Sequence, residues 1–216
     1  MTTMKENPRR ILWGAGTPRT MRAHWILHEL GLPYERHPFG PRTGETQTVE
    51  FTQLNPAQKI PVLQDGDFTL TESAAIVTYV GEKYGAPGTF VPLPGTVERA
   101  RYYQWSFFVM TELDAHTLYI IRKHIDLSKI YGEAPEAVRA AKEGFKKQVS
   151  VAAQALSSSG PFILGSSFTG ADILLSTCLV SAVRREIPLA DALQDYLERM
   201  TTRDGYQRAY QANQVS

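Results

Sequence analysis

Residues 55–76 read NPAQKIPVLQDGDFTLTESAAI, and this stretch decides the fold. Two apolar runs flank Asp65-Gly66, a pair suited to the positive φ angles of a tight turn, so the stretch predicts a hairpin of two antiparallel strands. After the hairpin, the apolar residues between Ala75 and Tyr84 recur every three to four positions, as in a helix. The stretch therefore predicts strand, strand and helix.

The residues before this stretch alternate between strand-like and helical patterns. ILWG at 11–14 is a compact apolar run, a helical period follows from Thr17 to Gly31, and residues 33–39 form a second extended run. Residues 46–54 predict a short irregular helix. Together, the first 85 residues predict an α/β domain in the order β-α-β-α-β-β-α.

The residues after this domain predict only helices. Residues 85–95 hold three prolines and three glycines without a period, so we place a linker at 86–95, between a domain over 9–85 and an all-helical domain over 96–216. Helices are expected at 97–127, 135–156, 171–185 and 190–200, with a shorter segment near the end. Thr169 and Asp172 have the spacing of a capping box, which is a folding feature.

Composition excludes several classes of protein. The 216 residues are 43% hydrophobic and 21% charged, with a formal charge of +1, so no global field attracts nucleic acid or an anionic membrane. The single cysteine, Cys178, forms no internal disulfide and is expected in the core. The first ten residues lack the apolar core of a secretory signal, and no apolar run reaches the roughly 18 residues that span a bilayer. We expect a cytoplasmic protein without nucleic-acid or membrane partners.

Three short motifs have residue types that suit binding or catalysis. Pro61 lacks an N–H, so the strand edge that it opens is partly unpaired and suits an extended peptide. Glu72-Ser73 opens a helix, whose free amides favour a carboxylate, while Glu72 can accept from an ammonium group. Thr17-Pro18 opens another helix, where a thiol would be stabilised as a thiolate.

Each motif also has a plain structural interpretation. Pro61 fits an ordinary strand start, and X-Pro bonds are cis in only about 5% of cases. Thr71 or Ser73 fits a common N-cap, and Thr17-Pro18 fits an N-cap followed by proline. His24 and His28 have a spacing that suits a metal, but no third ligand is in view, so we predict no metal site.

In this order, NPAQKIPVL, DGDFTLTESAAI and residues 168–172, FTGAD, resemble the cytosolic glutathione transferase superfamily. The resemblance covers nearly the whole chain and implies a thioredoxin-like domain followed by an all-α domain that supplies an acceptor pocket. It implies a homodimeric detoxification enzyme with glutathione as co-substrate and no metal. Residue by residue, it implies that the glutathione backbone pairs with Ile60 beside a cis Pro61. The implied glutathione-binding residues are Gln58, Lys59, Ile60, Pro61, Glu72 and Ser73.

The resemblance also implies which residue activates the thiol. Strand 11–14 ends in Trp13-Gly14, which argues against the tyrosine-type classes, and the first half has no cysteine for cysteine-type chemistry. The serine-type classes carry a motif similar to Ser-Pro-x-Ser, where this chain has residues 17–20, TPRT. Thr17 therefore takes the activating position, and Thr20 is the alternative contact for the thiol.

Three activities fit this resemblance. The first is transfer of glutathione to small hydrophobic electrophiles. The second is glutathione-dependent reduction of disulfides, which Thr17-Pro18 favours and Arg19 does not match. The third is a non-catalytic carrier of glutathione or apolar ligands, in which the peptide-binding edge persists without thiol activation.

Overall fold

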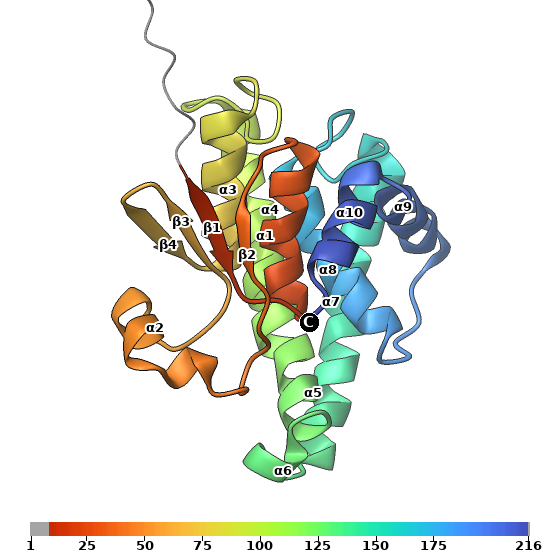
Figure 1. Ribbon diagram of the computed structural model, residues 1–216. Helices are drawn as coiled ribbons and strands as arrows, with labels where there is room; N and C mark the ends of the chain where they lie inside the picture. Colours follow the sequence, from red (N-terminus) through yellow and green to blue (C-terminus); the bar gives the residue numbers. More distant parts are fainter. Residues whose placement is uncertain (1–8, 216) are drawn as a thin grey trace, which may run out of the picture. The chain divides into compact units, whose positions relative to one another are not determined.

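The computed structural model describes residues 9–215 (Figure 1). The stretch 1–8, in which we predict no secretory signal, lies outside the described residues. The chain folds into two compact units, one of the described residues up to 80 together with those from 204 on, and one of residues 81–203. The sequence analysis assigned the segment from 204 to the helical domain, whereas in the structure it packs with the first unit. The limits of the linker at 86–95 remain a prediction.

The first unit contains a four-stranded mixed sheet. The strand order is β2-β1-β3-β4, with β2 parallel to β1 and both other pairs antiparallel. This arrangement confirms the predicted thioredoxin-like βαβαββα order. Its elements are β1 (Arg10–Trp13), α1 (Pro18–Glu29), β2 (Glu35–His37), a 3-10 turn (Glu45–Gln47), α2 (Val49–Leu54), β3 (Val62–Asp65), β4 (Phe68–Thr71) and the greater part of α3 (Ser73–Tyr84).

The predicted hairpin is present between β3 and β4. Asp65 is the last residue of β3 and pairs with Phe68, so the two turn residues are Gly66 and Asp67, one position later than the predicted pair. Of these, Gly66 has a positive φ of +62°. The Asp65 carboxylate is buried, where it lies 3.7 Å from the Arg10 guanidinium and accepts from the Tyr79 hydroxyl at 2.8 Å. These interactions tie the turn to β1 and α3.

Helix α10 (Asp204–Ala212) completes the first unit by packing along α1 (Figure 1). The Trp25 and Tyr206 rings meet edge to face at 4.9 Å. A β-carbon on Gly205 would lie 2.5 Å from the Glu29 carboxyl carbon, so the lack of a side chain there lets the two helices approach. The sequence predicted a short terminal helix but not its partner.

The second unit is built from helices, as predicted. Helix α8 is almost wholly buried and includes Cys178, which is 1% exposed and lies in the core as expected. None of the helices within the described residues is long and apolar enough to cross a membrane. The elements are α4 (Val97–Phe108), a π-helical segment (Val109–Leu118), α5 (Tyr119–His124), α6 (Ser128–Tyr131), α7 (Pro135–Ser159), α8 (Gly170–Val183) and α9 (Asp191–Thr201).

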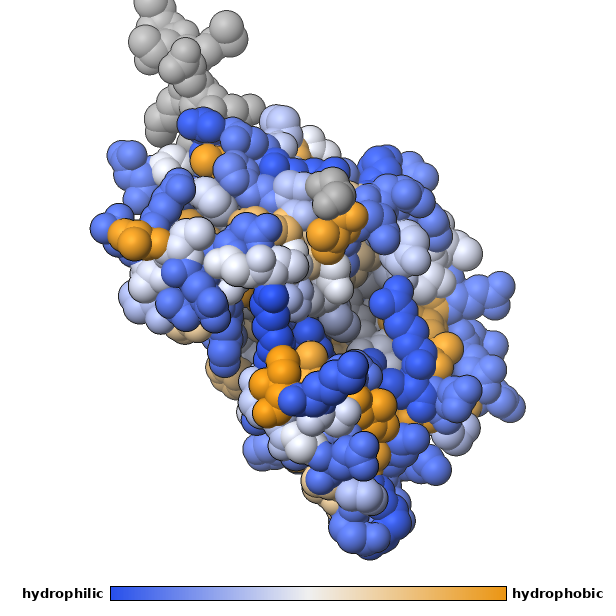
Figure 2. Space-filling view, turned by 60° about the horizontal axis from the view of Figure 1, so that its bottom comes forward, coloured by the Kyte–Doolittle hydropathy of each residue, from blue (hydrophilic) through white to orange (hydrophobic). Residues whose placement is uncertain are grey.

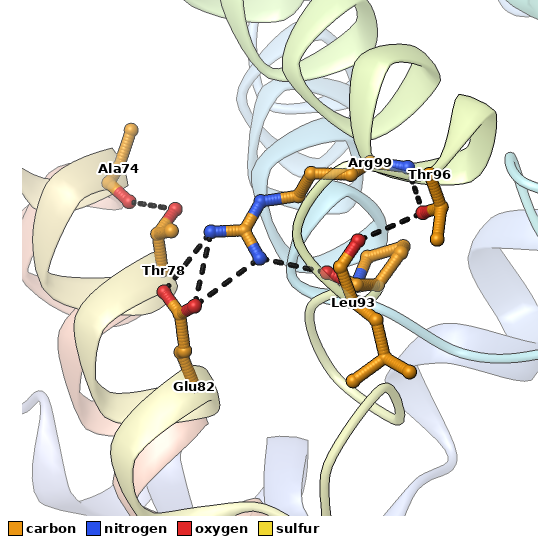
Figure 3. Close-up of polar contacts among 7 residues, drawn as sticks. Ala74, Thr78, Glu82, Leu93, Thr96 and Arg99 are labelled. Atoms are coloured by element: carbon orange, nitrogen blue, oxygen red, sulfur yellow. Dashed lines mark hydrogen bonds and ion pairs between the residues drawn. The ribbon is translucent and has the colours of Figure 1, made fainter.

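Arg99 fixes the segment between α3 and α4 in place (Figure 3). Its guanidinium donates to both Glu82 carboxylate oxygens, at 3.0 and 3.1 Å, and to the Pro92 carbonyl at 2.7 Å. The Thr96 hydroxyl donates to the Leu93 carbonyl at 2.8 Å and accepts from the Arg99 N–H at 3.1 Å, which caps α4. Arg99 therefore joins the end of α3 to the second half of the predicted linker.

Exposed apolar side chains of the second unit are spread over several elements. Val97 and Phe107 on α4 and Ile130 on α6 are all more than half exposed. On the face shown in Figure 2, hydrophobic residues form separate groups among hydrophilic ones. This face therefore presents no continuous apolar surface among the described residues.

Asp172 is the polar centre of the second unit. Its carboxylate accepts from the Thr169 N–H and hydroxyl, at 2.8 and 2.9 Å, from the Ile163 N–H at 2.8 Å and from the Tyr196 hydroxyl at 2.9 Å. The predicted capping box is thus present at the start of α8. Burial raises the pKa of Asp172, and the four donors oppose that shift by stabilising the carboxylate.

We predict that Asp172→Ala lowers the free energy of unfolding by about 3 kcal/mol, because it leaves several buried donors without an acceptor. Urea denaturation followed by circular dichroism measures the change. Asp191→Ala, at the exposed start of α9, is the matched control and should cost well under that amount. Ligand affinity per folded molecule should stay the same, and an unchanged melting temperature for Asp172→Ala would contradict the prediction.

Candidate active site

The three predicted motifs meet at one edge of the sheet. Trp13, Val62 and Thr71 pair across β1, β3 and β4 in a single row. Because neighbouring strands here run in opposite directions, the end of β1, the start of β3 and the end of β4 lie at the same edge. Motifs that are separate in sequence thereby border a common surface.

The loop between β1 and α1 lies directly against Ile60. Gly14 has a φ of +100°, and a β-carbon built on it would lie 2.4 Å from the Ile60 Cβ, so both conformation and space require glycine. This approach places the predicted thiol-activating loop beside the Ile60–Pro61 peptide bond. That bond is cis, as the resemblance implies.

Thr17 caps α1 and forms a reciprocal pair with Thr20. The Thr20 N–H donates to the Thr17 Oγ1 and the Thr17 N–H donates to the Thr20 Oγ1, each at 3.0 Å, and the two hydroxyl oxygens are also 3.0 Å apart. Pro18 takes the first helical position, as predicted. The pair holds both hydroxyls at the end of α1 whose dipole favours an anion.

The protons of the two hydroxyls have different surroundings. Thr20 is fully buried, and its oxygen lies 2.6 Å from the Asn213 Oδ1 and 2.9 Å from the Thr17 carbonyl oxygen. A hydroxyl has one proton, so the Thr20 proton is directed to an acceptor inside the protein. Thr17 retains 6% exposure. The geometry therefore favours Thr17 as the hydroxyl that donates to a ligand.

A turn anchored by Asn55 carries Gln58 and Lys59. The buried Asn55 amide donates to the Lys59 carbonyl at 2.8 Å and accepts from the Ala57 N–H at 3.1 Å. Gln58 and Lys59 are both exposed, and the Gln58 amide donates to the Thr52 hydroxyl at 3.0 Å. The turn thus places both side chains just before Ile60. The sequence analysis did not single out Asn55, although Asn-Pro is a turn signal.

Glu72 and Ser73 lie where β4 gives way to α3. Glu72 has a φ of +65°, a conformation that costs a residue with a side chain about 1–3 kcal/mol and is concentrated at functional sites. The Glu72 carbonyl accepts from the Ile76 N–H at 2.9 Å, so α3 begins immediately after it. The first amides of a helix have no partner within it, which suits a carboxylate at Ser73.

Arg22 lies behind Ser73 and was missed by the sequence analysis. It is 1% exposed, and its Nη1 donates to the Ser73 Oγ at 3.2 Å. A hydroxyl oxygen that accepts from a guanidinium keeps its own proton for another acceptor. The buried cation also favours an anion nearby. Because Arg22 shares α1 with the Thr17 cap, one helix serves two of the three motifs.

His24 is a structural residue of this unit. The chain of hydrogen bonds runs from His28 to Tyr34 at 3.1 Å, from Tyr34 to the His24 Nδ1 at 2.6 Å, and from the His24 Nε2 to the Gly14 carbonyl at 3.3 Å. Both His24 nitrogens are thereby engaged. No cluster of three metal-ligating side chains occurs within residues 9–215.

The chain is similar to known glutathione transferases. Residues 9–82 match the family model "Glutathione S-transferase, N-terminal domain". Glutathione S-transferase 3 of Zea mays is 39% identical over 89 residues, which are 41% of this chain and 40% of that protein. The first curated relatives are matched over only 25–40% of their own length.

Two solved structures agree with this family match over nearly the whole chain. A glutathione transferase homologue from Lodderomyces elongisporus has a TM-score of 0.88 at 22% identity and covers 95% of this chain and 99% of its own, which shows the fold. A theta-class enzyme from Xanthomonas axonopodis pv. citri with glutathione bound has a TM-score of 0.80 at 26% identity, with 94% and 97% covered. Residues 9–82 therefore match a glutathione S-transferase N-terminal domain, and the described chain has the glutathione transferase fold.

We predict that His24 makes the first unit sensitive to acid. Burial lowers the pKa of His24 from 6.5 to about 3, so below pH 6.5 the unfolded chain takes up a proton that the folded chain does not. This contribution to the free energy of unfolding is complete above pH 6.5 and decreases as the pH falls from 6.5 towards 3, by at most about 1.4 kcal/mol per pH unit.

Urea denaturation at several pH values between about 7 and 4 measures this slope. His24→Gln should make it shallower, whereas His116→Gln, at a largely exposed position of the second unit, should leave it as it is. An equal slope in His24→Gln and in the unaltered protein would count against the assignment.

Proposed function

We propose that this protein is an enzyme, a glutathione transferase that conjugates glutathione to small hydrophobic electrophiles. The main support for this proposal is the position of three motifs at one edge of the sheet: the loop with Thr17, the cis Ile60–Pro61 bond and the start of α3 at Ser73. A solved theta-class relative holds glutathione, which supports glutathione as the co-substrate. No metal takes part in the proposed reaction.

From Val62 onward, β3 pairs with β1 on one side and with β4 on the other, so it lacks the unpaired strand edge expected from the sequence. Glutathione would lie against the backbone of Ile60 and Pro61, which precede the strand. Its cysteinyl backbone pairs with Ile60, its γ-glutamyl carboxylate accepts from Ser73, and its ammonium donates to Glu72. Lys59, with Gln58 as a weaker contact, reaches the glycyl carboxylate. Every polar end of the tripeptide then has a partner of complementary charge or hydrogen-bonding capacity.

Thr17 would stabilise the thiolate. Its hydroxyl donates to the sulfur, and the start of α1 adds the favourable end of the helix dipole. The thiolate then forms a carbon–sulfur bond with the electrophile while the leaving group departs with its electron pair. The thiol proton is lost to solvent when glutathione binds.

We expect Thr17→Val to raise the pKa of the bound thiol towards the ordinary thiol value of about 8.5, because valine keeps the shape but lacks the donor. Turnover of a small aryl halide should decrease by about tenfold or more. Absorbance of the thiolate at about 240 nm across pH measures the pKa. Thr17→Ser is the matched control and should keep the pKa low; an unchanged pKa in Thr17→Val would exclude Thr17 from this role.

Arg22→Met tests the carboxylate contact. It should weaken glutathione binding by about tenfold, because Ser73 loses the buried cation behind it. A glutathione analogue without the γ-glutamyl α-carboxylate should bind both proteins equally, as calorimetry can measure. Ser73→Ala should likewise weaken the binding of glutathione but not of the analogue. The double variant should lose less binding free energy than the sum of the two single losses. Equal weakening for glutathione and the analogue would refute the contact.

Reduction of disulfides shares the same first step. There the thiolate attacks a disulfide sulfur, the other sulfur leaves as a thiolate, and a second glutathione reduces the mixed disulfide to give oxidised glutathione. Thr17-Pro18 favours this activity, while Arg19 does not match it. Measuring turnover of disulfides and of aryl halides with the same protein distinguishes the two activities. A non-catalytic carrier would bind glutathione with its thiol pKa unaltered.

We also propose a cytoplasmic homodimer that acts in detoxification. The superfamily likeness supports this assembly and location. Each unit carries an aromatic side chain available for a partner, since Phe68 on β4 is 46% exposed and Phe107 on α4 is 67% exposed. The acceptor pocket is proposed on the helical domain.

A further inference from the structure

The residues after α10 lie against the loop that carries Thr17. The Gly16 N–H donates to the Asn213 carbonyl at 2.8 Å, and Arg36 donates to the Gln214 carbonyl at 3.2 Å. A β-carbon on Gly16, whose φ is +77°, would lie 2.7 Å from a Val215 methyl carbon. Figure 1 shows the segment after α10 beside the start of α1.

The Asn213 side chain binds both members of the threonine pair. Its Oδ1 accepts from the Thr20 hydroxyl at 2.6 Å, and its Nδ2 donates to the Thr17 carbonyl at 3.2 Å. Only this orientation of the amide makes both contacts favourable, because the reverse would set two oxygens against each other at Thr17. Asn213 thus contacts the pair although it lies 193 residues from Thr20 in sequence.

These bonds determine what the Thr20 hydroxyl does. The Thr17 carbonyl accepts from the Met21 N–H at 3.0 Å and from Asn213, so its two lone pairs are filled. The Thr20 proton is then directed to the Asn213 Oδ1, its shortest contact. Thr20 is left as an acceptor towards Thr17, whose N–H it receives. Hydrogen bonds therefore restrain the N–H, the hydroxyl oxygen and the carbonyl of Thr17.

We propose that Asn213 is a positioning residue that holds the Thr17 hydroxyl in the orientation needed to stabilise the glutathione thiolate. This inference rests on the proposed function, in which Thr17 donates to the sulfur. Asn213 does not touch the thiol and acts through Thr20 and the Thr17 carbonyl. Without its amide, the first turn of α1 is less restrained and the hydroxyl spends less time aimed at the sulfur.

The pKa of bound glutathione tests the proposal in the full-length protein. Asn213→Ala should reduce the ratio of thiolate to thiol at about pH 7 by about threefold or more, which corresponds to a rise of about half a pKa unit. Asn213→Asp has the same size and should reduce it further, because a carboxylate replaces the donor to Thr17 and adds negative charge near the sulfur. Gln214→Ala is the control and should show no change, because the Gln214 side chain donates away from the pair, to the Tyr210 carbonyl at 2.9 Å.

A double mutant separates positioning from a general loss of structure. Thr20→Val removes one of the two groups through which Asn213 acts, so adding Asn213→Ala to it should raise the thiol pKa by less than Asn213→Ala does alone. Full additivity, or an unchanged pKa in folded Asn213→Ala and Asn213→Asp, would overturn the proposal. If Thr17→Val also left the thiol pKa unchanged, the proposed function itself would be wrong. If Thr17→Val raised the pKa while the Asn213 variants did not, only the proposed role of Asn213 would be wrong.

Discussion

The pairing of Trp13, Val62 and Thr71 across three antiparallel-linked strands is the constraint on which the candidate site depends. One row of the sheet determines where the loop before α1, the turn before β3 and the start of α3 lie. This row brings the loop before α1 against Ile60 only because Gly14 has no side chain, since a β-carbon on Gly14 would lie 2.4 Å from the Ile60 Cβ. Any larger residue would move the loop away from Ile60 and separate Thr17 from the peptide edge.

Helix α1 serves this edge in several ways at once. Its first residue is preceded by Thr17, its second turn brings Arg22 behind Ser73, and His24 further along reaches back to the Gly14 carbonyl. A shift of the helix along its axis would therefore disturb the proposed thiol and carboxylate contacts and the contact with the Gly14 carbonyl together. The packing of α10 against α1, where two aromatic rings meet edge to face, opposes such a shift.

The polar groups of the site are satisfied in a way that leaves specific donors for a ligand. Thr20, Asn213 and Arg22 direct hydrogen bonds to other protein groups. The Thr17 and Ser73 hydroxyls each accept from such a partner and each has one proton to donate, which in Thr17 can go to the Thr20 oxygen at 3.0 Å or to a ligand. The second unit shows the opposite arrangement at its buried capping box, where all four donors to the carboxylate come from the protein and stabilise α8.

The sequence alone determined the features that depend on neighbouring residues. The hairpin between β3 and β4 and the Thr17-Pro18 cap follow from turn and cap chemistry within a few positions, and the resemblance in three motifs indicated the glutathione transferase fold and the cis bond at Pro61. Only the tertiary structure decided that Arg22 donates to Ser73, 51 residues away, and that Asn213 accepts from Thr20, 193 residues away. Nothing in the local pattern marks these partners, because arginine and asparagine side chains are mostly exposed. Their roles depend on where α1 lies relative to the start of α3 and to α10, which the packing of the whole unit decides.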